Sequence, residues 1–447
     1  MIDKLKNFYH NGMSPEELAE RVLSDNFGYE TPPIPIDPFK LMRKYGIVYQ
    51  FKEFKDLEGI YLVPEDETDI AIVGINYGRP ITRQRFTAAH ELCHHLKDRK
   101  NETCLINSKE AIEKYAECFA AELLMPRKTF KSVAMEYAKD GKVTFDDALQ
   151  IADRFGVSFQ SCAFRLAYRF DMLEGDYSNL SSLIKKYRPD KKKVALGMEI
   201  ERLELIRQAI DSYEFFFQVE PNIVWYQFKN DFIYNENRME GLDIDEEEVA
   251  EIVTDLRINR QNSIYCEDNY EDIIQVIGHA SLYDYILETD DNITIYKLLD
   301  LNKKLFQFAP YPDEAGKTRT DNNLVLGAKF ETLDWREVAQ ALVDLQKPVE
   351  QLVNNASELS ISEYVLEAMK IHHRITQIHP FRDGNGRSSR ALLNWLLRYK
   401  GLPPIYFKLT EKKSYYTALE IADKQGTYRE LLRVAIRELF RTIMRVV

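Results

Sequence analysis

Helical periodicity of apolar residues runs through most of this chain and is lost between about Glu174 and Lys193. That stretch contains Gly, Pro, several serines and a cluster of lysines, a composition that is typical of a connection between domains. With 447 residues, the chain is long enough for two to four domains of about 100–200 residues each. We therefore expect two unlike folded parts, joined by a linker at residues 174–197.

The charge of the chain is acidic and unevenly distributed. The sequence has 60 Lys and Arg against 72 Asp and Glu, a formal net charge of −12, and residues 231–300 alone sum to −15. This balance argues against a generally basic protein that coats nucleic acid. Apolar residues make up 45% of the chain, which is ordinary for globular proteins and excludes a mainly disordered one.

Neither the start of the chain nor its cysteines indicate export. The first residues, MIDKLKNFYHNGMSPEE, are charged early and lack an apolar core, so we expect no signal peptide. No stretch approaches the roughly 18 consecutive apolar residues of a membrane span. Five cysteines without regular spacing are typical of reduced thiols. These features predict a cytoplasmic protein without a membrane partner.

The first part of the chain combines helices with a small sheet. The sequence Ser14-Pro15-Glu16-Glu17 has the pattern of a capping box with Pro at the first helical position, which predicts the start of a helix. Two short apolar runs, 59–63 and 70–75, flank an acidic turn and predict a β-hairpin. Helical periodicity then extends from Thr82 to about Met125, where Pro126 follows.

The sequence His90-Glu91-Leu92-Cys93-His94 has the form H-E-x-x-H and lies within this helical stretch. Histidines at positions i and i+4 lie on one helix face, so both imidazoles can bind a single Zn²⁺. Glu91 projects about 100° round the helix, where its carboxylate can take a proton from a metal-bound water. Two histidines and one further ligand leave a position open for that water. The pattern predicts a zinc-dependent hydrolase.

A third metal ligand is expected from the next helical segment, where Glu113 and Glu117 offer carboxylates one turn apart. With the F-A-A-E-L-L-M-P run that follows, these motifs resemble the ImmA/IrrE family of metallopeptidases, cytosolic enzymes that cleave regulatory repressor proteins. The resemblance implies a zincin-like domain over residues 1–173, with Glu113 as third zinc ligand and Glu117 orienting a ligand histidine. Because the family more often has Asn or Asp at the second position, the two glutamates could exchange roles.

Two segments downstream, 149–158 and 162–170, have the rhythm of a helix-turn-helix, whose second helix would read DNA. However, residues 141–170 sum to only +1, and apolar residues nearly encircle the second helix, as in a buried one. We therefore favour a structural helical hairpin and do not expect direct binding of nucleic acid.

The stretch His379-Pro-Phe-Arg-Asp-Gly-Asn-Gly-Arg-Ser-Ser-Arg390 predicts a loop that opens directly into a helix. Its glycines permit close backbone approach, and the N–H groups at a helix start can hold an anion. Asp383 is placed to bind Mg²⁺ beside phosphates, while Arg387 and Arg390, one turn apart, can clamp phosphate oxygens. His379 can accept the proton of an attacking hydroxyl. The pattern predicts transfer of a nucleotide or phosphate group.

This stretch matches the motif H-P-F-x-D-G-N-G-R-x-x-R at every defined position, and residues 198–447 are similar to the Fic family. Fic enzymes typically transfer AMP from Mg·ATP to a Ser, Thr or Tyr hydroxyl of a target protein. The resemblance implies an all-α Fic fold in which His379 is the general base and Asp383 binds magnesium. It implies phosphate contacts by Gly384, Asn385, Gly386, Arg387 and Arg390. Residues Gly316–Gly327 resemble the family's β-hairpin flap, which holds the target segment by strand addition.

Fic proteins often silence themselves with a helix that carries (S/T)-x-x-x-E-(G/N), whose glutamate pairs with the second motif arginine. The sequence Glu236-Asn-Arg-Met-Glu240-Gly241 fits the E-G ending, but Glu236 stands at the Ser/Thr position. The resemblance implies that Glu240 pairs with Arg390 and inhibits the Fic site.

Together, these patterns predict a mainly helical α+β protein with two activities. The Fic part would use ATP and Mg²⁺ to modify a target protein that docks on the flap, and the zinc peptidase part would cleave a repressor protein. Such a pairing suits a toxin, defence or stress regulator. In the alternative interpretation, the peptidase-like part does not cleave, but senses a ligand or binds a partner that regulates the Fic enzyme.

Overall fold

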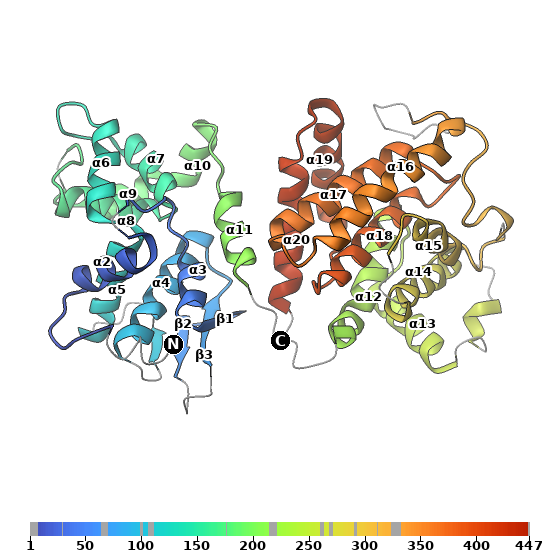
Figure 1. Ribbon diagram of the computed structural model, residues 1–447, viewed down its shortest axis with the longest axis horizontal. Helices are drawn as coiled ribbons and strands as arrows, with labels where there is room; N and C mark the ends of the chain where they lie inside the picture. The colour runs from blue at the N-terminus through green and yellow to red at the C-terminus, as the bar shows by residue number, and fades with distance from the viewer. Residues whose placement is uncertain are drawn as a thin grey trace. The chain divides into compact units, whose positions relative to one another are not determined.

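In the computed structural model, the chain divides into two compact units, Met1–Glu214 and Phe215–Val447 (Figure 1). None of the helices formed by the described residues has both the length and the apolar character that a membrane crossing needs. The structure describes residues 8–28, 30–63, 70–98, 102–105, 111–175, 177–213, 221–259, 263–267, 271–289, 293–310, 312–322 and 332–445.

The first unit contains a mixed four-stranded sheet in the order β1-β3-β2-β4. Strand β3 pairs parallel with β1 and antiparallel with β2, while β4 pairs antiparallel with β2. The antiparallel β2–β3 pair confirms the strands expected from the two apolar runs. The strands are β1 (Ile47–Lys52), β2 (Leu57–Leu62), β3 (Ala71–Asn76) and β4 (Glu102–Leu105).

Helices α4 (Ile81–Lys97) and α5 (Ala111–Leu124) pack against each other, and α4 also contacts β2 and β3. The stretch predicted as helical from Thr82 to Met125 thus forms two helices, as the expectation of a next helical segment implied, but strand β4 between them was not predicted. Pairing with β2 decides the structure of this short segment, since strand formation depends on tertiary context more than on local propensity. Helix α5 ends just before Pro126, as predicted.

Further helices complete the first unit. The predicted capping box is present, because the Ser14 and Glu17 side chains each accept a hydrogen bond from the other residue's backbone N–H. In the segment considered as a helix-turn-helix, the second helix buries Phe159, Cys162 and Ala163, which supports the structural hairpin. These elements are α2 (Pro15–Phe27), α3 (Pro38–Lys44), α6 (Arg127–Tyr137), α7 (Phe145–Phe155), α8 (Phe159–Phe164) and the π-helix η1 (Arg165–Arg169).

The segment interpreted as a linker, residues 174–197, contains helices α9 (Leu180–Tyr187) and α10 (Pro189–Ala195) and lies inside the first unit. Tyr187 stacks on Phe159 with ring centroids 4.5 Å apart. Lys193, from the basic run, forms an ion pair with Asp153 at 3.0 Å. Part of the lysine cluster therefore forms ion pairs with acidic residues of the first unit, although the composition of this segment predicted a linker.

Helix α11 (Leu203–Asp211) and the residues after it also belong to the first unit. Tyr213 stacks on Phe51 of β1 with ring centroids 5.5 Å apart. The buried Arg85 of α4 donates to the carbonyl oxygen of Gly156 and to the side chain of Gln208. The division between compact units therefore falls at Glu214, after α11, instead of between residues 174 and 197.

The described residues of the second unit form helices and no strand, in agreement with the all-α expectation for this part. Helix α18 is buried on nearly every side and packs against α15 and α17. The helices are α12 (Pro221–Glu240), α13 (Glu246–Asn259), α14 (Glu271–Glu288), α15 (Lys297–Leu305), α16 (Trp335–Asn354), α17 (Ile361–Ile378), α18 (Asn385–Tyr399), α19 (Lys412–Gln425) and α20 (Arg429–Arg445).

The predicted flap, Gly316–Gly327, is described only in part. Residues 316–322 form no strand, and residues 323–331 lie outside the described part of the chain. The expected β-hairpin flap therefore stays a prediction.

Candidate functional sites

Helices α4 and α5 bring His90, His94 and Glu113 together in the first unit. The Nε2 atom of His90 lies 3.1 Å from Nε2 of His94 and 3.1 Å from Oε2 of Glu113, and His94 Nε2 lies 3.5 Å from Glu113 Oε1. All three side chains are buried. Atoms bound tetrahedrally to one zinc ion at about 2.0–2.1 Å lie roughly 3.4 Å from one another. The spacing of this N, N, O donor set therefore fits zinc.

The protonation of His90 and Glu113 suits a metal ligand role. Burial lowers the pKa of His90, so that its imidazole is neutral near pH 7 and has a lone pair to donate. Burial alone would raise the pKa of Glu113, but the hydrogen bond and charge of His90 hold it below the usual value. A neutral imidazole and an ionised carboxylate are the forms that bind zinc.

Asp98 orients His94, a role that the sequence interpretation gave to Glu117. The Nδ1 atom of His94 lies 2.9 Å from Oδ2 of Asp98. This contact favours the tautomer in which Nδ1 carries the proton and the Nε2 atom, on the side of Glu113, has a free lone pair. Glu117 is exposed on α5, one turn beyond the buried Glu113. Asp98 follows His94 at i+4, so the signal that could have found it is the same helical spacing that identified the histidine pair.

Glu91 is fully buried on α4 and faces strand β2. A Cβ atom at Gly59 of β2 would lie 2.7 Å from Glu91 Oε1 and 2.5 Å from Thr87 Cγ2. Only glycine leaves room there, so the close approach of α4 and β2 confines the Glu91 carboxylate between the helix and the sheet.

The neighbours of the histidine pair serve packing. Both ring nitrogens of His95 are engaged, Nδ1 with the Tyr61 hydroxyl at 3.0 Å and Nε2 with the Tyr45 carbonyl oxygen at 3.1 Å. His95 is therefore buried and not exposed to solvent. Cys93 is buried too, and burial raises the pKa of its thiol, which keeps it protonated and suits a packing role.

In the second unit, the loop between α17 and α18 is held by hydrogen bonds to its backbone. Asn385 bonds twice to Phe381, since its Nδ2 donates to the carbonyl oxygen and its Oδ1 accepts from the N–H, both at 2.8 Å. Arg319 is buried and donates from Nε to the His379 carbonyl oxygen at 2.8 Å, while its N–H donates to the Pro380 carbonyl oxygen at 2.9 Å. Sequence reasoning missed Arg319, and its position within the predicted flap was the only signal.

The loop enters α18 through a left-handed turn at Gly384, whose φ is 75°. A Cβ atom there would lie 2.6 Å from Cε2 of Phe306, so close packing as well as the dihedral angle requires glycine. Asn302 of α15 donates to the Asp383 carbonyl oxygen at 3.1 Å and to the Ser388 hydroxyl at 3.2 Å. These contacts fix the first turn of α18, where backbone N–H groups are available to an anion.

The chemical side chains of the motif lie around this turn. His379 ends α17 in the left-handed region with φ 51°, and burial lowers its pKa, so that the imidazole is neutral near pH 7. Asp383 is more than half exposed, and its Oδ1 lies 3.2 Å from a terminal nitrogen of Arg387. A cavity of about 380 Å³ opens beside the loop. It is lined by Asn302, Phe306, Glu314, Ala315, Phe381, Arg382 and Asp383.

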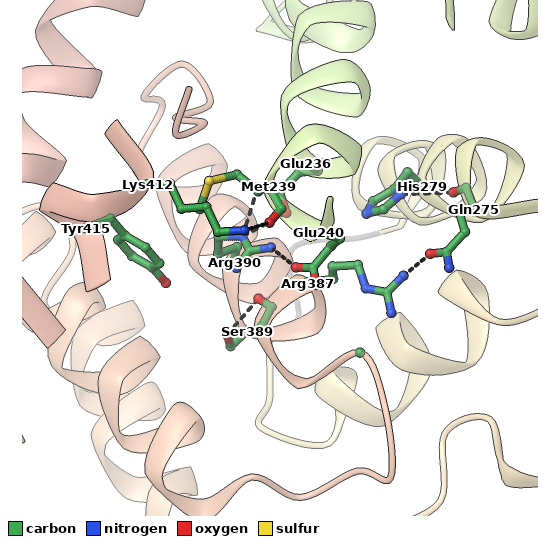
Figure 2. A network of polar contacts seen from close by, with 12 residues as sticks. Glu236, Met239, Glu240, Gln275, His279, Arg387, Ser389, Arg390, Lys412 and Tyr415 are labelled. Carbon is green, nitrogen blue, oxygen red and sulfur yellow. Dashed lines mark hydrogen bonds and ion pairs between the residues drawn. The ribbon is translucent and has the colours of Figure 1, made fainter. Parts of the chain in front are cut away.

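Arg390 is nearly enclosed and contacts two carboxylates of α12 (Figure 2). The predicted contact with Glu240 is present, with Arg390 Nη2 donating to Oε1 at 2.7 Å. Its Nε also donates to both oxygens of Glu236, at 3.0 and 2.8 Å, a contact that sequence reasoning missed. The sequence feature that could have indicated this contact is the glutamate that stands at position 236 in place of Ser or Thr.

Further polar contacts hold Arg387 and the end of α12 beside this group of Arg390, Glu236 and Glu240 (Figure 2). Arg387 donates to the Gln275 side chain, and Lys412 Nζ donates to the Met239 carbonyl oxygen at 2.7 Å near the end of α12. The buried His279 bonds through Nδ1 to the Gln275 carbonyl oxygen at 2.9 Å, and burial lowers its pKa to about 3. His279 is therefore neutral beside the arginines.

Two segments of the chain match known protein families. Residues 42–167 match the IrrE N-terminal-like domain, and residues 292–397 match the Fic/DOC family. Protein adenylyltransferase fic-1 of Caenorhabditis elegans is 29% identical over 157 residues, which cover 35% of this chain and 29% of that protein. Protein adenylyltransferase Fic of Nematostella vectensis is 28% identical over 177 residues, or 38% of each chain. The chain thus spans well under half the length of these relatives.

Solved structures of Fic proteins are also similar to the chain. Fic-1 from C. elegans gives a TM-score of 0.45 at 19% identity and covers 71% of this chain and 91% of that one. BepC from Bartonella tribocorum, a structure with bound AMPPNP, gives a TM-score of 0.33 at 19% identity, with 43% of this chain and 87% of that one covered.

Proposed function

We propose that the second unit transfers AMP from ATP to a hydroxyl group of a target protein, in a chain that combines an IrrE N-terminal-like domain with a Fic/DOC domain. The observation that carries this proposal is the arrangement around the start of α18: a neutral His379, a loop fixed by Asn385 and Arg319, and two arginines in the first turns of the helix.

The residues divide the reaction between them. His379 takes the proton of the target hydroxyl, whose oxygen attacks the α-phosphate of ATP while the bond to the β-phosphate breaks. Arg387 and Arg390 stabilise the pyrophosphate that leaves, and the N–H groups at the start of α18 bind its oxygens. Asp383 would hold Mg²⁺, which neutralises phosphate charge when bound. Glu240 occupies Arg390 in the inhibited state, and Gly316–Gly327 would hold the target segment.

Labelled ATP tests this proposal directly. The protein is incubated in a cell lysate with ATP that carries a label on the α-phosphate, and labelled protein bands are identified. We expect the Glu240→Gly variant to label faster than wild type and the double variant Glu240→Gly/His379→Ala not to label. Equal labelling by Glu240→Gly and the double variant would contradict the proposal.

We further propose that the first unit is a zinc-dependent peptidase that cleaves a regulatory protein. The compact His90, His94 and Glu113 group supports this, and zinc bound there would activate a water molecule for hydrolysis. Glu91 would take the proton of that water. Zinc content should be lost in His90→Ala and kept in Glu91→Gln, while Glu91→Gln abolishes cleavage of proteins in a lysate. If wild type and Glu91→Gln give identical protein fragments, the unit is instead a non-cleaving sensor or binding module.

A further inference from the structure

Two carboxylates of one helix meet on the guanidinium group of Arg390. Glu236 and Glu240 lie one turn apart on α12, and they take different edges of the arginine (Figure 2). The Nε–H group donates to Glu236, with its oxygens at 3.0 and 2.8 Å, whereas Nη2 donates to Glu240 at 2.7 Å. One arginine charge is therefore opposed by two acidic side chains.

The two glutamates differ in their exposure to solvent. The Glu236 side chain is 1% exposed, as enclosed as the Arg390 side chain at 2%, while the Glu240 side chain is 31% exposed. Burial raises the pKa of Glu236, whereas Arg390 and Arg387 hold the pKa of Glu240 below its usual value despite its burial. An anion that approaches Arg390 from solvent can displace the exposed Glu240. It cannot replace Glu236 without leaving a buried charge unpaired, which is strongly destabilising.

The charge balance after Glu240 departs follows from this difference. Arg387 and Arg390 then contribute two positive charges. Asp383 lies 3.2 Å from Arg387, and the buried Glu236 cancels the charge of Arg390. Its carboxylate also lies within hydrogen-bond distance of the arginine that would clamp a phosphate, so the phosphate and Glu236 repel each other across Arg390. A serine or threonine at position 236 would add no such repulsion.

We propose that Glu236 is a positioning residue that makes the site discriminate between nucleotides by the charge of their phosphates. It holds Arg390 in place but cancels much of its charge. The site therefore gains little affinity from the outermost phosphate of ATP, even when Glu240 is gone. This inference rests on the proposed nucleotide site. In this view α12 restrains the site twice, through the displaceable Glu240 and through the permanent Glu236.

Nucleotide affinities measured by calorimetry test the role of Glu236. Dissociation constants of AMP and of ATP, each with Mg²⁺, are measured for Glu240→Gln and for the double variant Glu236→Gln/Glu240→Gln. Glutamine keeps the shape of the side chain and removes its charge. Relative to the single variant, we expect the double variant to bind ATP at least about tenfold more tightly and AMP less than about twofold more tightly. The KM for ATP in labelling should fall with the dissociation constant, while kcat changes less.

A matched control removes one negative charge elsewhere in the same acidic region. Glu251 is exposed on α13, and Glu251→Gln in the Glu240→Gln background should leave the affinity for ATP unchanged. Melting temperatures show whether each variant is folded. If Glu236→Gln does not fold, Glu236→Ser replaces it with the same expectation.

The outcomes separate this inference from the proposed function. If the double variant binds ATP no better than Glu240→Gln, or gains equally for AMP, the role of Glu236 is overturned while transfer from ATP stands. An equal gain from Glu251→Gln would reduce the effect to general charge and overturn it as well. If no variant binds ATP, the nucleotide site itself is wrong and the inference falls with it.

Discussion

At the scale of single residues, His379 allows a prediction about pH. Burial lowers the pKa of His379 below the ordinary histidine value of about 6.5, so the neutral form that accepts a proton persists into mildly acidic solution. We expect the labelling rate of Glu240→Gly to stay constant from about pH 8 to pH 6.5 and to fall only at lower pH. Rates of ATP labelling across this range measure it. A decline that begins above pH 7 would contradict the proposed base.

Asp98 and Glu117 give a matched pair of variants for the metal site. Asp98 contacts His94, so Asp98→Asn should lower zinc affinity about 10–100-fold, because the carboxylate no longer fixes the tautomer of that ligand. Glu117→Gln should leave the affinity unchanged, since this side chain is exposed on α5. Zinc affinity is measured by competition with a chelator. The reverse order of effects would restore the interpretation from sequence, in which Glu117 orients a histidine.

At the scale of elements, the approach of α4 to β2 depends on Gly59. In Gly59→Ala, the added methyl group would meet Thr87 and Glu91 at distances shorter than van der Waals contact, so helix and strand must move apart. Overpacking of this kind costs about 1–3 kcal/mol, and the shift also moves Glu91 relative to the ligand histidines. Thermal unfolding should show the loss of stability. Gly78→Ala controls for glycine replacement, because its φ is not positive and the added methyl group would meet only the Asn76 side-chain oxygen, at 3.2 Å.

Helix α12 is held at its end by Lys412, which donates to the Met239 carbonyl oxygen. Replacing this lysine by methionine keeps the aliphatic stem and removes the donor, so the last turn of α12, which carries Glu240, should separate from Arg390 more often. We expect Lys412→Met to label target proteins from ATP faster than wild type does, but more slowly than Glu240→Gly. The exposed neighbour Lys413 provides the control, and Lys413→Met should match wild type.

The sequence allowed good prediction where local chemistry decides the structure. The capping box at Ser14 and the spacing of His90 and His94 depend on short, fixed intervals along a helix. The contact of Glu240 with Arg390 joins two helices, and it was expected only from the resemblance to the Fic family. Contacts made across the fold were not predictable in this way. Arg319 reaches the loop after α17 from 60 residues away, and β4 forms because β2 lies beside it.

At the scale of the whole molecule, the boundary between the units differs from the one that composition predicted. The basic, serine-containing stretch at 174–197 suggested a solvated linker, but helices α9 to α11 pack within the first unit. Composition records how polar a segment is and not which partner it meets. Tyr187 and Tyr213 are the aromatic residues whose stacking decides the matter, and both lie beyond the expected end of the first domain at residue 173.

Fragments of the chain test this boundary. A fragment of residues 1–214 keeps the stacking of Tyr213 on Phe51 and of Tyr187 on Phe159, whereas a fragment of residues 1–173 loses both and leaves Phe51 and Phe159 without these aromatic partners. Burial of an aromatic side chain contributes about 1.5–3 kcal/mol, so the longer fragment should melt at a clearly higher temperature and the shorter one should bind zinc weakly or aggregate. Melting curves and zinc content measure the two. Equal melting temperatures would show that α9 to α11 add nothing to the first unit and would return the boundary to the stretch at 174–197.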